Sequence, residues 1–216
     1  MSIGVVARKI LGKKLFPYAG RVYRRIFVDL EKVVQESLEF IPPGAFVLDI
    51  GGGDGEPLNH LLALRPDITV AMIDLNLSIG NAIKHEFVGR VTKHPGMSIG
   101  HYFAEKQKTP QVILINDVIH HIPATLRGQF FTDLNKICRS SRNKINIVIK
   151  DVEPGTYRAT LSFLADKYIS GDKNVTLISR SELIELVKQS IEDVHVVETK
   201  LYLFDKPNYS IVFFTR

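Results

Sequence analysis

The chain has 216 residues, of which 45% are hydrophobic and 24% are charged. These values are ordinary for one globular domain and exclude disordered, collagen-like and fibrous chains. The single cysteine, Cys138, excludes an intrachain disulfide and a zinc site built from several cysteines.

The net charge of +5 is concentrated near the start of the chain. Residues 1–28 hold seven of the 28 basic residues and no acid, and the remainder carries 21 basic and 23 acidic residues. Only this segment can present a cationic surface to an anionic partner, and without a basic stripe elsewhere we expect no nucleic-acid binding. No apolar run reaches the roughly 18 residues that cross a bilayer, and no signal peptide is evident. We therefore expect a cytoplasmic protein.

Residues 1–41 are predicted to form a helical leader. Apolar residues recur every three or four positions in residues 3–15 and again in residues 22–38, which predicts two amphipathic helices. Pro42-Pro43-Gly44 separates this leader from the rest of the chain. Two roles are open: a lid over the site, or a surface that uses its basic residues for peripheral membrane contact.

The second unit, residues 42–216, is predicted to be an α/β domain with a mostly parallel, doubly wound sheet and helices on both faces, because short aliphatic runs alternate with helical patterns. The predicted parallel strands are Phe46–Ile50, Thr69–Ile73, Gln111–Asn116 and Ile145–Lys150, with a weaker one near Val91 or over Met97–Gly100.

Helices are predicted to begin near Pro57, Ser78 and Ala124. A further helix should follow Ser179, because Ser179 and Glu182 have the spacing of a capping box. The last two strands, Val194–Phe204 and Tyr209–Thr215, flank a turn and should pair antiparallel.

Residues 47–55 read Val-Leu-Asp-Ile-Gly-Gly-Gly-Asp-Gly, a buried strand that runs into a glycine-rich turn. A phosphate-binding P-loop would need a lysine and a hydroxyl after the last glycine, and a dinucleotide loop would need glycine or alanine at Glu56. Asp49, Asp54 and Glu56 would repel a pyrophosphate and favour a ligand with ammonium or sulfonium charge.

Asp49-x-Gly51-x-Gly53-x-Gly55 resembles the loop of the class I S-adenosylmethionine-dependent methyltransferases, most closely the small-molecule group. The resemblance extends over residues 40–216, through Asp74 at the end of the second strand, the segment Val-Ile-Leu-Ile-Asn-Asp-Val-Ile-His-His-Ile-Pro at 112–123 and the final hairpin. It implies a Rossmann-like seven-stranded fold, S-adenosylmethionine as cofactor and methyl transfer as the reaction.

The resemblance also implies cofactor-binding residues at the ends of the strands. The loop glycines would let the backbone approach the ligand, Asp49 would hold its ammonium group and Asp74 would accept both ribose hydroxyls. Leu75 would pack on adenine, and His101 stands where the family commonly places an acid for the adenine amino group. The complete expected set is Asp49, Gly51, Gly53, Gly55, Asp74, Leu75, His101, Asn116 and Asp117.

His120 and His121 are the candidate catalytic bases, because a neutral imidazole accepts a proton near neutral pH. If the segment is extended, adjacent side chains point oppositely, so at most one of the two should face the acceptor. A metal at Asp117 and these histidines would need a further well-placed ligand, and none is expected. Lys150 and Asp151 either line the acceptor pocket or form an ion pair at the strand ends.

These observations predict a methyltransferase for a small or lipid-like acceptor, with oxygen preferred over other atoms as the methylated position. Residues 152–180 should supply an apolar cover from Tyr157, Leu161, Phe163, Leu164 and Tyr168. One alternative is a non-catalytic module that binds S-adenosylmethionine and docks through its basic leader on a membrane or partner. Another is an enzyme that uses the same cofactor for a different reaction.

Overall fold

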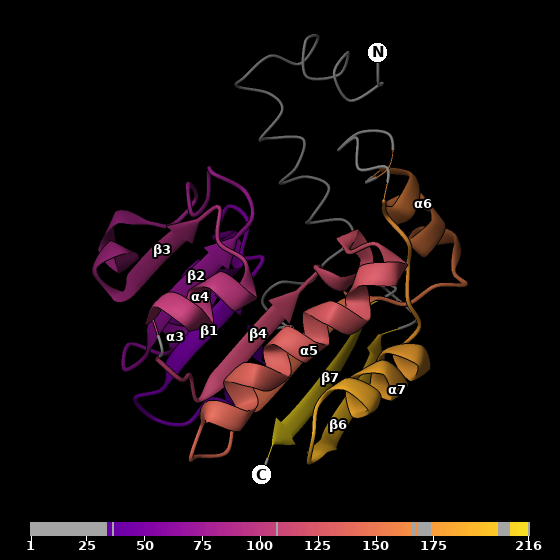
Figure 1. Cartoon of the computed structure of the whole chain (residues 1–216). Helices are drawn as coiled ribbons and strands as arrows, with labels where there is room; N and C mark the ends of the chain where they lie inside the picture. Colours follow the sequence, from indigo (N-terminus) through magenta and orange to yellow (C-terminus); the bar gives the residue numbers. More distant parts are fainter. Residues whose placement is uncertain are drawn as a thin grey trace, which may run out of the picture.

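The computed structural model describes residues 34–35, 37–106, 108–165, 167, 174–202 and 208–215. Within them, seven strands form one sheet in the order β3-β2-β1-β4-β5-β7-β6 (Figure 1). The strands are β1 (Phe46–Ile50), β2 (Thr69–Asp74), β3 (Val91–Pro95), β4 (Val112–Asn116), β5 (Asn146–Val152), β6 (Val194–Tyr202) and β7 (Asn208–Thr215). Strands β1 to β5 are parallel, and β7 is antiparallel to both β5 and β6. The predicted sheet, with its antiparallel last pair, is confirmed.

Helices cover both faces of this sheet (Figure 1). The first face packs against α4 (Ile99–Lys106), α5 (Ala124–Ser140) and α7 (Arg180–Ser190), and the second against α3 (Glu56–Leu64). Alternate residues of one strand enter the two cores: Leu48 lies in the first and Val47 in the second. This alternation explains the nearly continuous apolar runs of the central strands, which are buried on both faces.

The helix predicted near Ser78 is wrong. Residues 75–84 form a loop, followed by the 3-10 helix η1 (His85–Arg90). Gly80 has a φ of 63° and donates its N–H to the carbonyl of Gly53 over 2.9 Å, and Ala82 N–H donates to Asp54 O over 2.8 Å. The loop therefore uses its backbone donors to hold the glycine turn instead of forming helical hydrogen bonds.

Of the two positions considered for the weak strand, Val91 is correct. Strand β3 ends at Pro95, and Ile99, at the end of the alternative range, is the first residue of α4. The helix after Ser179 is confirmed with both bonds of its capping box. Helix α3 begins at Glu56, with Pro57 in its first turn, where a missing N–H leaves no intrahelical bond unmade.

Several sequence predictions lie outside the described residues. They include the leader helices up to residue 33, Tyr168 and the turn before Asn208. Residues 34, 35, 37 and 38 are helical, as the second leader pattern predicts. In the part of the chain that the structure describes, no helix is long and apolar enough to span a membrane.

The strand order places β1 beside β4, although β2 follows β1 in the chain. The connections therefore leave these two strands in opposite directions and open a crevice beyond their carboxyl ends, where ligands of such sheets bind. The glycine turn follows β1 at this point, and the histidine pair follows β4.

Candidate active site

A cavity of about 820 Å³ lies at the carboxyl ends of β1, β2, β4 and β5. Polar residues from the ends of these strands and from the turns after them line it, among them Gly51, Gly52, Gly53, Asp54, Asp74, Asn76, Asn116, Asp117, His121 and Lys150. Apolar residues also line it, among them Met97, Ile99, Val118, Ile122, Leu126 and Phe130. The cavity thus combines acidic and amide groups with an apolar wall suited to an apolar molecule.

Gly51, Gly53 and Gly55 all have positive φ angles, which favour glycine. Gly51 N–H donates to Ile73 O over 2.8 Å, and Gly53 N–H donates to Asp74 Oδ2 over 3.1 Å, so the turn is fixed to the end of β2. Open space surrounds Gly53, and its backbone faces the cavity. Gly55 does not line the cavity; a Cβ there would lie 2.6 Å from Ile83 Cγ1, so this glycine lets the neighbouring loop pack closely.

Gly52 has a role that the spacing of the other glycines did not reveal. A Cβ on Gly52 would lie 2.1 Å from Asp49 Oδ2 and 2.7 Å from Met72 Cε. The missing side chain therefore leaves room for the carboxylate of Asp49 directly beneath the turn. The middle glycine of the run Gly51-Gly52-Gly53 was the available signal for this close approach.

Asp49 and Asp74 form an acidic pair under the glycine turn. Burial, and secondly the charge of Asp74, raise the pKa of Asp49 from 3.8 to about 7. The carboxylate of Asp74 accepts from Gly53 N–H and, over 2.8 Å, from Asn76 N–H. Two backbone donors therefore orient Asp74 at the cavity wall, while each of its oxygens keeps a further lone pair.

The structure separates the two residues expected beside adenine. Leu75 lines the cavity and is 75% exposed. His101 lies on α4, exposed and outside the cavity lining, because β3 ends earlier than its prediction assumed. Met97 and Ser98 occupy the wall instead.

Asn116 and Asp117 close the cavity at the end of β4. Among the described residues, the buried Oδ1 of Asn116 has no hydrogen-bond partner and is an acceptor available to a ligand donor. Asp117 has a φ of 56°, which is uncommon for a residue with a side chain and is a form of strain found at functional sites.

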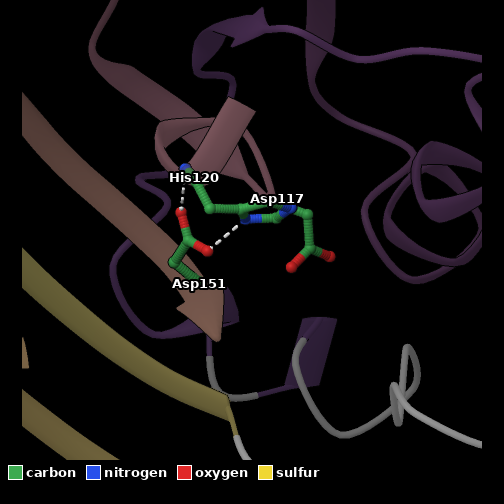
Figure 2. A group of neighbouring side chains, drawn as sticks. All are labelled: Asp117, His120 and Asp151. Carbon is green, nitrogen blue, oxygen red and sulfur yellow. Dashed lines mark hydrogen bonds and ion pairs between the residues drawn. The ribbon is translucent and has the colours of Figure 1, made fainter. Parts of the chain in front are cut away.

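The histidine pair lies on a 3-10 turn, η2 (Ile119–His121), and the extended conformation considered for it is wrong. His121 lines the cavity, whereas His120 is 2% exposed and lies behind the wall. Nδ1 of His120 is hydrogen-bonded to Asp151 Oδ1, and His120 N–H donates to Asp151 Oδ2 over 3.2 Å (Figure 2). The two histidine rings have centroids 4.1 Å apart.

Asp151 is fully buried at the end of β5. Burial raises its pKa, but the charge and hydrogen bond of His120, the N–H of Val152 and the charge of Lys150 together outweigh this, and the net pKa is lowered. Because an ionised carboxylate only accepts, Nδ1 of His120 carries the hydrogen and a neutral ring has its lone pair on Nε2. This pairing was missed, although β4 and β5 are neighbours and bring the ends of both strands together.

Lys150 combines the two roles that the sequence left open, since it lines the cavity and also forms an ion pair. Its Nζ is 2.6 and 2.7 Å from the two carboxylate oxygens of Asp117. Asp151 does not line the cavity. Asp117, His120 and Asp151 each place one potential metal-binding atom within 4.8 Å of the others, but both carboxylates already hold a charged or hydrogen-bonding partner.

Among the described residues, the apolar cover comes from elements other than those predicted. The expected residues of α6 (Tyr157–Ala165) do not line the cavity, and Tyr157 is 78% exposed. The start of α4, the turn after β4 and the first turns of α5 supply the apolar wall. The amphipathic pattern of α6 gave no indication of which surface it faces.

The arrangement suits a cationic nucleoside better than a polyphosphate. Carboxylates and an unpaired amide oxygen surround the glycine turn, and the lysine at the cavity is neutralised by Asp117. Next to this polar region stand a carboxylate-bound histidine and an apolar wall, the parts needed to take a proton from a bound molecule.

The comparisons with known proteins agree with this geometry. A family model described as "Methyltransferase domain" matches residues 20–190, well over half of the chain. A comparison with curated protein sequences found no significant match.

Similar folds occur in solved structures of low sequence identity. The pyocyanin biosynthetic protein PhzM is 14% identical with a TM-score of 0.65, and the match covers 87% of this chain and 54% of PhzM. The mitomycin 7-O-methyltransferase MmcR is 20% identical with a TM-score of 0.63, covering 88% of this chain and 54% of MmcR. The O-methyltransferase NcsB1 from neocarzinostatin biosynthesis, in complex with S-adenosylmethionine and 2-hydroxy-5-methyl naphthoic acid, is 19% identical with a TM-score of 0.55, covering 79% and 48%. The chain spans about half the length of these proteins, and it belongs to the methyltransferase domain family, within the class I S-adenosylmethionine-dependent methyltransferases.

Proposed function

We propose that the protein transfers the methyl group of S-adenosylmethionine to a hydroxyl oxygen of a small acceptor, with His120 as the general base. The observation that carries this proposal is the buried His120–Asp151 pair, which stands directly behind the wall of a cavity suited to a cationic nucleoside.

The described residues fit the cofactor. Asn116 Oδ1 is suited to its ammonium group, Asp74 to its ribose hydroxyls and Leu75 to its adenine. Asp49 is 4% exposed and does not line the cavity, so it acts on the ammonium group through its charge from beneath the glycine turn. The bound cofactor supplies an electrophilic methyl group on a positively charged sulfur. The residues of the chain hold the acceptor in line with that group and accept the proton that its hydroxyl loses.

The geometry of the His120–Asp151 pair, called the dyad below, favours His120 over His121 as the base. Asp151 holds the His120 ring through Nδ1 and leaves the lone pair on Nε2, and it stabilises the imidazolium that forms when the ring takes a proton. Asp117, Val118 and His121, close neighbours of His120 in the chain, line the cavity, so we expect an acceptor hydroxyl to reach this ring directly or through one water. His121 then serves as part of the acceptor wall.

The apolar wall of Met97, Ile122, Leu126 and Phe130 supports a small, largely apolar acceptor. MmcR and NcsB1 are described as O-methyltransferases, which supports oxygen as the methylated atom. For the leader we propose a lid, because Val34 and Ser37, near its end, line the cavity.

The test is to incubate the protein with methyl-labelled S-adenosylmethionine and a small-molecule extract of its source. A product in which NMR places the labelled methyl group on oxygen supports the proposal. Calorimetric binding of S-adenosylmethionine with no labelled product would reject the transfer step, and a label on nitrogen or carbon would reject the hydroxyl acceptor.

Replacing Asp74 by asparagine is expected to weaken S-adenosylmethionine binding by about 10- to 100-fold. The carboxylate of Asp74 accepts from Gly53 N–H and Asn76 N–H, and an amide would point its NH₂ group at one of these donors. The same change therefore removes the negative charge and disturbs the turn. Calorimetric titration measures the effect.

The matched control is Asp133→Asn on α5, where the carboxylate bonds to exposed Lys136 and Gln129. Its affinity should equal that of the wild type. If Asp74→Asn bound S-adenosylmethionine as tightly as the control, Asp74 would not contribute to cofactor binding.

Cofactor binding is expected to tighten about fivefold to tenfold between pH 6 and pH 7.5. The pKa of Asp49 is raised to about 7, so this carboxyl is mostly protonated at the lower pH and attracts an ammonium group only once it ionises. Binding below neutral pH should therefore release a proton, which calorimetry in buffers of different ionisation enthalpy detects.

The variant Asp49→Asn should lose this pH dependence and bind weakly throughout. The folded wild type keeps a proton on Asp49 that the unfolded chain loses between about pH 4 and pH 7, so its stability falls as the pH rises through this window. At pH 8 the asparagine variant should be more stable than the wild type by about 2 to 4 kcal/mol in urea unfolding. A variant of unchanged stability at pH 8 would show that Asp49 carries no such penalty.

A further inference from the structure

His120 has carboxylates on two sides, and only one of them belongs to the dyad. Figure 2 shows its ring between Asp151 and Asp117. One carboxylate oxygen of Asp117 lies within 4.8 Å of a ring nitrogen of His120. At this separation a carboxylate strongly favours the imidazolium form. Two such charges would leave the ring protonated and unable to act as a base at neutral pH.

Lys150 cancels one of these charges. Its side chain is 1% exposed, and its ammonium group contacts both oxygens of Asp117, at 2.6 and 2.7 Å. The backbone reinforces the arrangement, because Asp117 N–H donates to Lys150 O over 2.9 Å and Asn116 pairs with Lys150 in the sheet register. A lysine in the middle of a sheet is costly to bury and is stable here only with this partner.

We propose that Lys150 is a positioning residue for the His120–Asp151 dyad: by neutralising Asp117, it keeps His120 in its neutral, proton-accepting form. The consequence for the reaction rests on the proposed role of His120 as base. The electrostatic effect of Lys150 and Asp117 on His120 is independent of that role.

The other charged groups around the ring leave this relation intact. Among the described residues, these groups are Asp151 and Lys150 on β5, Asp117 and His121 beside the turn after β4, and Arg127 on α5 and Tyr209 on β7, which act on Asp151. Arg127 and Tyr209 interact with Asp151, and Arg127 also donates to Ile122 O and Thr176 O, which hold the histidine turn. Tyr209 also interacts electrostatically with Asp117, while Lys150 contacts both of its carboxylate oxygens directly.

The test follows the titration of His120 by NMR in the full-length protein without acceptor, with its signal assigned by comparison with His120→Asn. In Lys150→Met the unpaired Asp117 should raise the titration midpoint of His120 by about one pH unit, a tenfold change in proton affinity. In Asp117→Asn the unpaired ammonium should lower it. In the double variant, which has neither charge, the midpoint should return close to that of the wild type.

Opposite shifts that cancel in the double variant are the signature of charge compensation, because a merely structural disturbance would not change sign. Lys150→Arg, which keeps the charge, should leave the midpoint near its original value. If one single variant does not fold, the other single variant and the double variant still decide the question. Midpoints that stay constant, or shifts that persist in the double variant, would overturn the proposal.

The proposed function fails separately. If His120→Asn still transferred methyl groups at the full rate, His120 would not be the catalytic base, but the titration result would still stand. If His120 is the base, the pH at which kcat/KM falls on the acidic side should move up in Lys150→Met with the midpoint.

Discussion

Replacing His120 by asparagine should lower kcat for methyl transfer by about 10²- to 10⁴-fold, the range for loss of a positioned general base. Asparagine keeps a polar group beside the buried Asp151 but cannot take a proton. Alanine would leave this carboxylate without its ring partner and would threaten folding. Incorporation of labelled methyl groups into the product measures the effect.

The matched variant is His121→Ala, one residue further along the same turn. His121 lines the cavity but is not bonded to Asp151, so its loss should raise KM and change kcat less than tenfold. Both variants should bind S-adenosylmethionine with wild-type affinity, which separates chemistry from cofactor binding. A larger loss of kcat in the His121 variant than in the His120 variant would mean that His121 is the base and His120 is not. Unchanged kcat in both would mean that the acceptor needs no histidine base.

Replacing Gly52 by alanine should destabilise the protein by about 1 to 3 kcal/mol and weaken cofactor binding at least tenfold. The new Cβ would be placed 2.1 Å from Asp49 Oδ2 and 2.7 and 2.9 Å from Met72 Cε and Cγ. Asp49 is buried in β1 and has no room to withdraw, so the turn must move away from the strand. Thermal unfolding and calorimetric titration measure the two effects.

The matched control is Gly128→Ala on α5, which is expected to have the opposite effect on stability. A Cβ there meets no atom within 4 Å, and alanine is the better helix former by about 1 kcal/mol. Gly128→Ala should therefore be slightly more stable than the wild type and should bind the cofactor normally. Normal binding by Gly52→Ala would mean that the loop tolerates a side chain and that its approach to Asp49 is not required.

Much of the fold could be predicted from hydrophobic patterns and turn residues. β1 is predicted with its observed bounds because it is bounded by a proline-glycine turn and a glycine loop. The segment after Ser78 was mistaken for a helix because its backbone donors go to the glycine turn, a long-range contact that local patterns do not encode. The error at His101 came from a short third strand, whose end at Pro95 depends on pairing with β2.

The sequence predicts which residues form the candidate site better than it predicts the contacts between them. Strand ends bring Asp49, Asp74 and Asn116 to one edge of the sheet, and this follows from parallel topology alone. The contacts of His120 and His121 do not follow from the topology of the sheet. Whether Asp151 binds His120 or lines the cavity depends on the 3-10 turn after β4, which sets the direction of each ring.

The position of β7 has a consequence for how the protein is made. β7 follows β6 in the chain, yet in the sheet it lies between β5 and β6 and pairs with both. While the chain emerges from the ribosome, β6 therefore has no neighbour to join, and β5 presents an unpaired edge until residues 208–215 have left the exit tunnel. An incomplete chain that stops before β7 would expose that edge, a surface that chaperones and proteases recognise in nascent proteins.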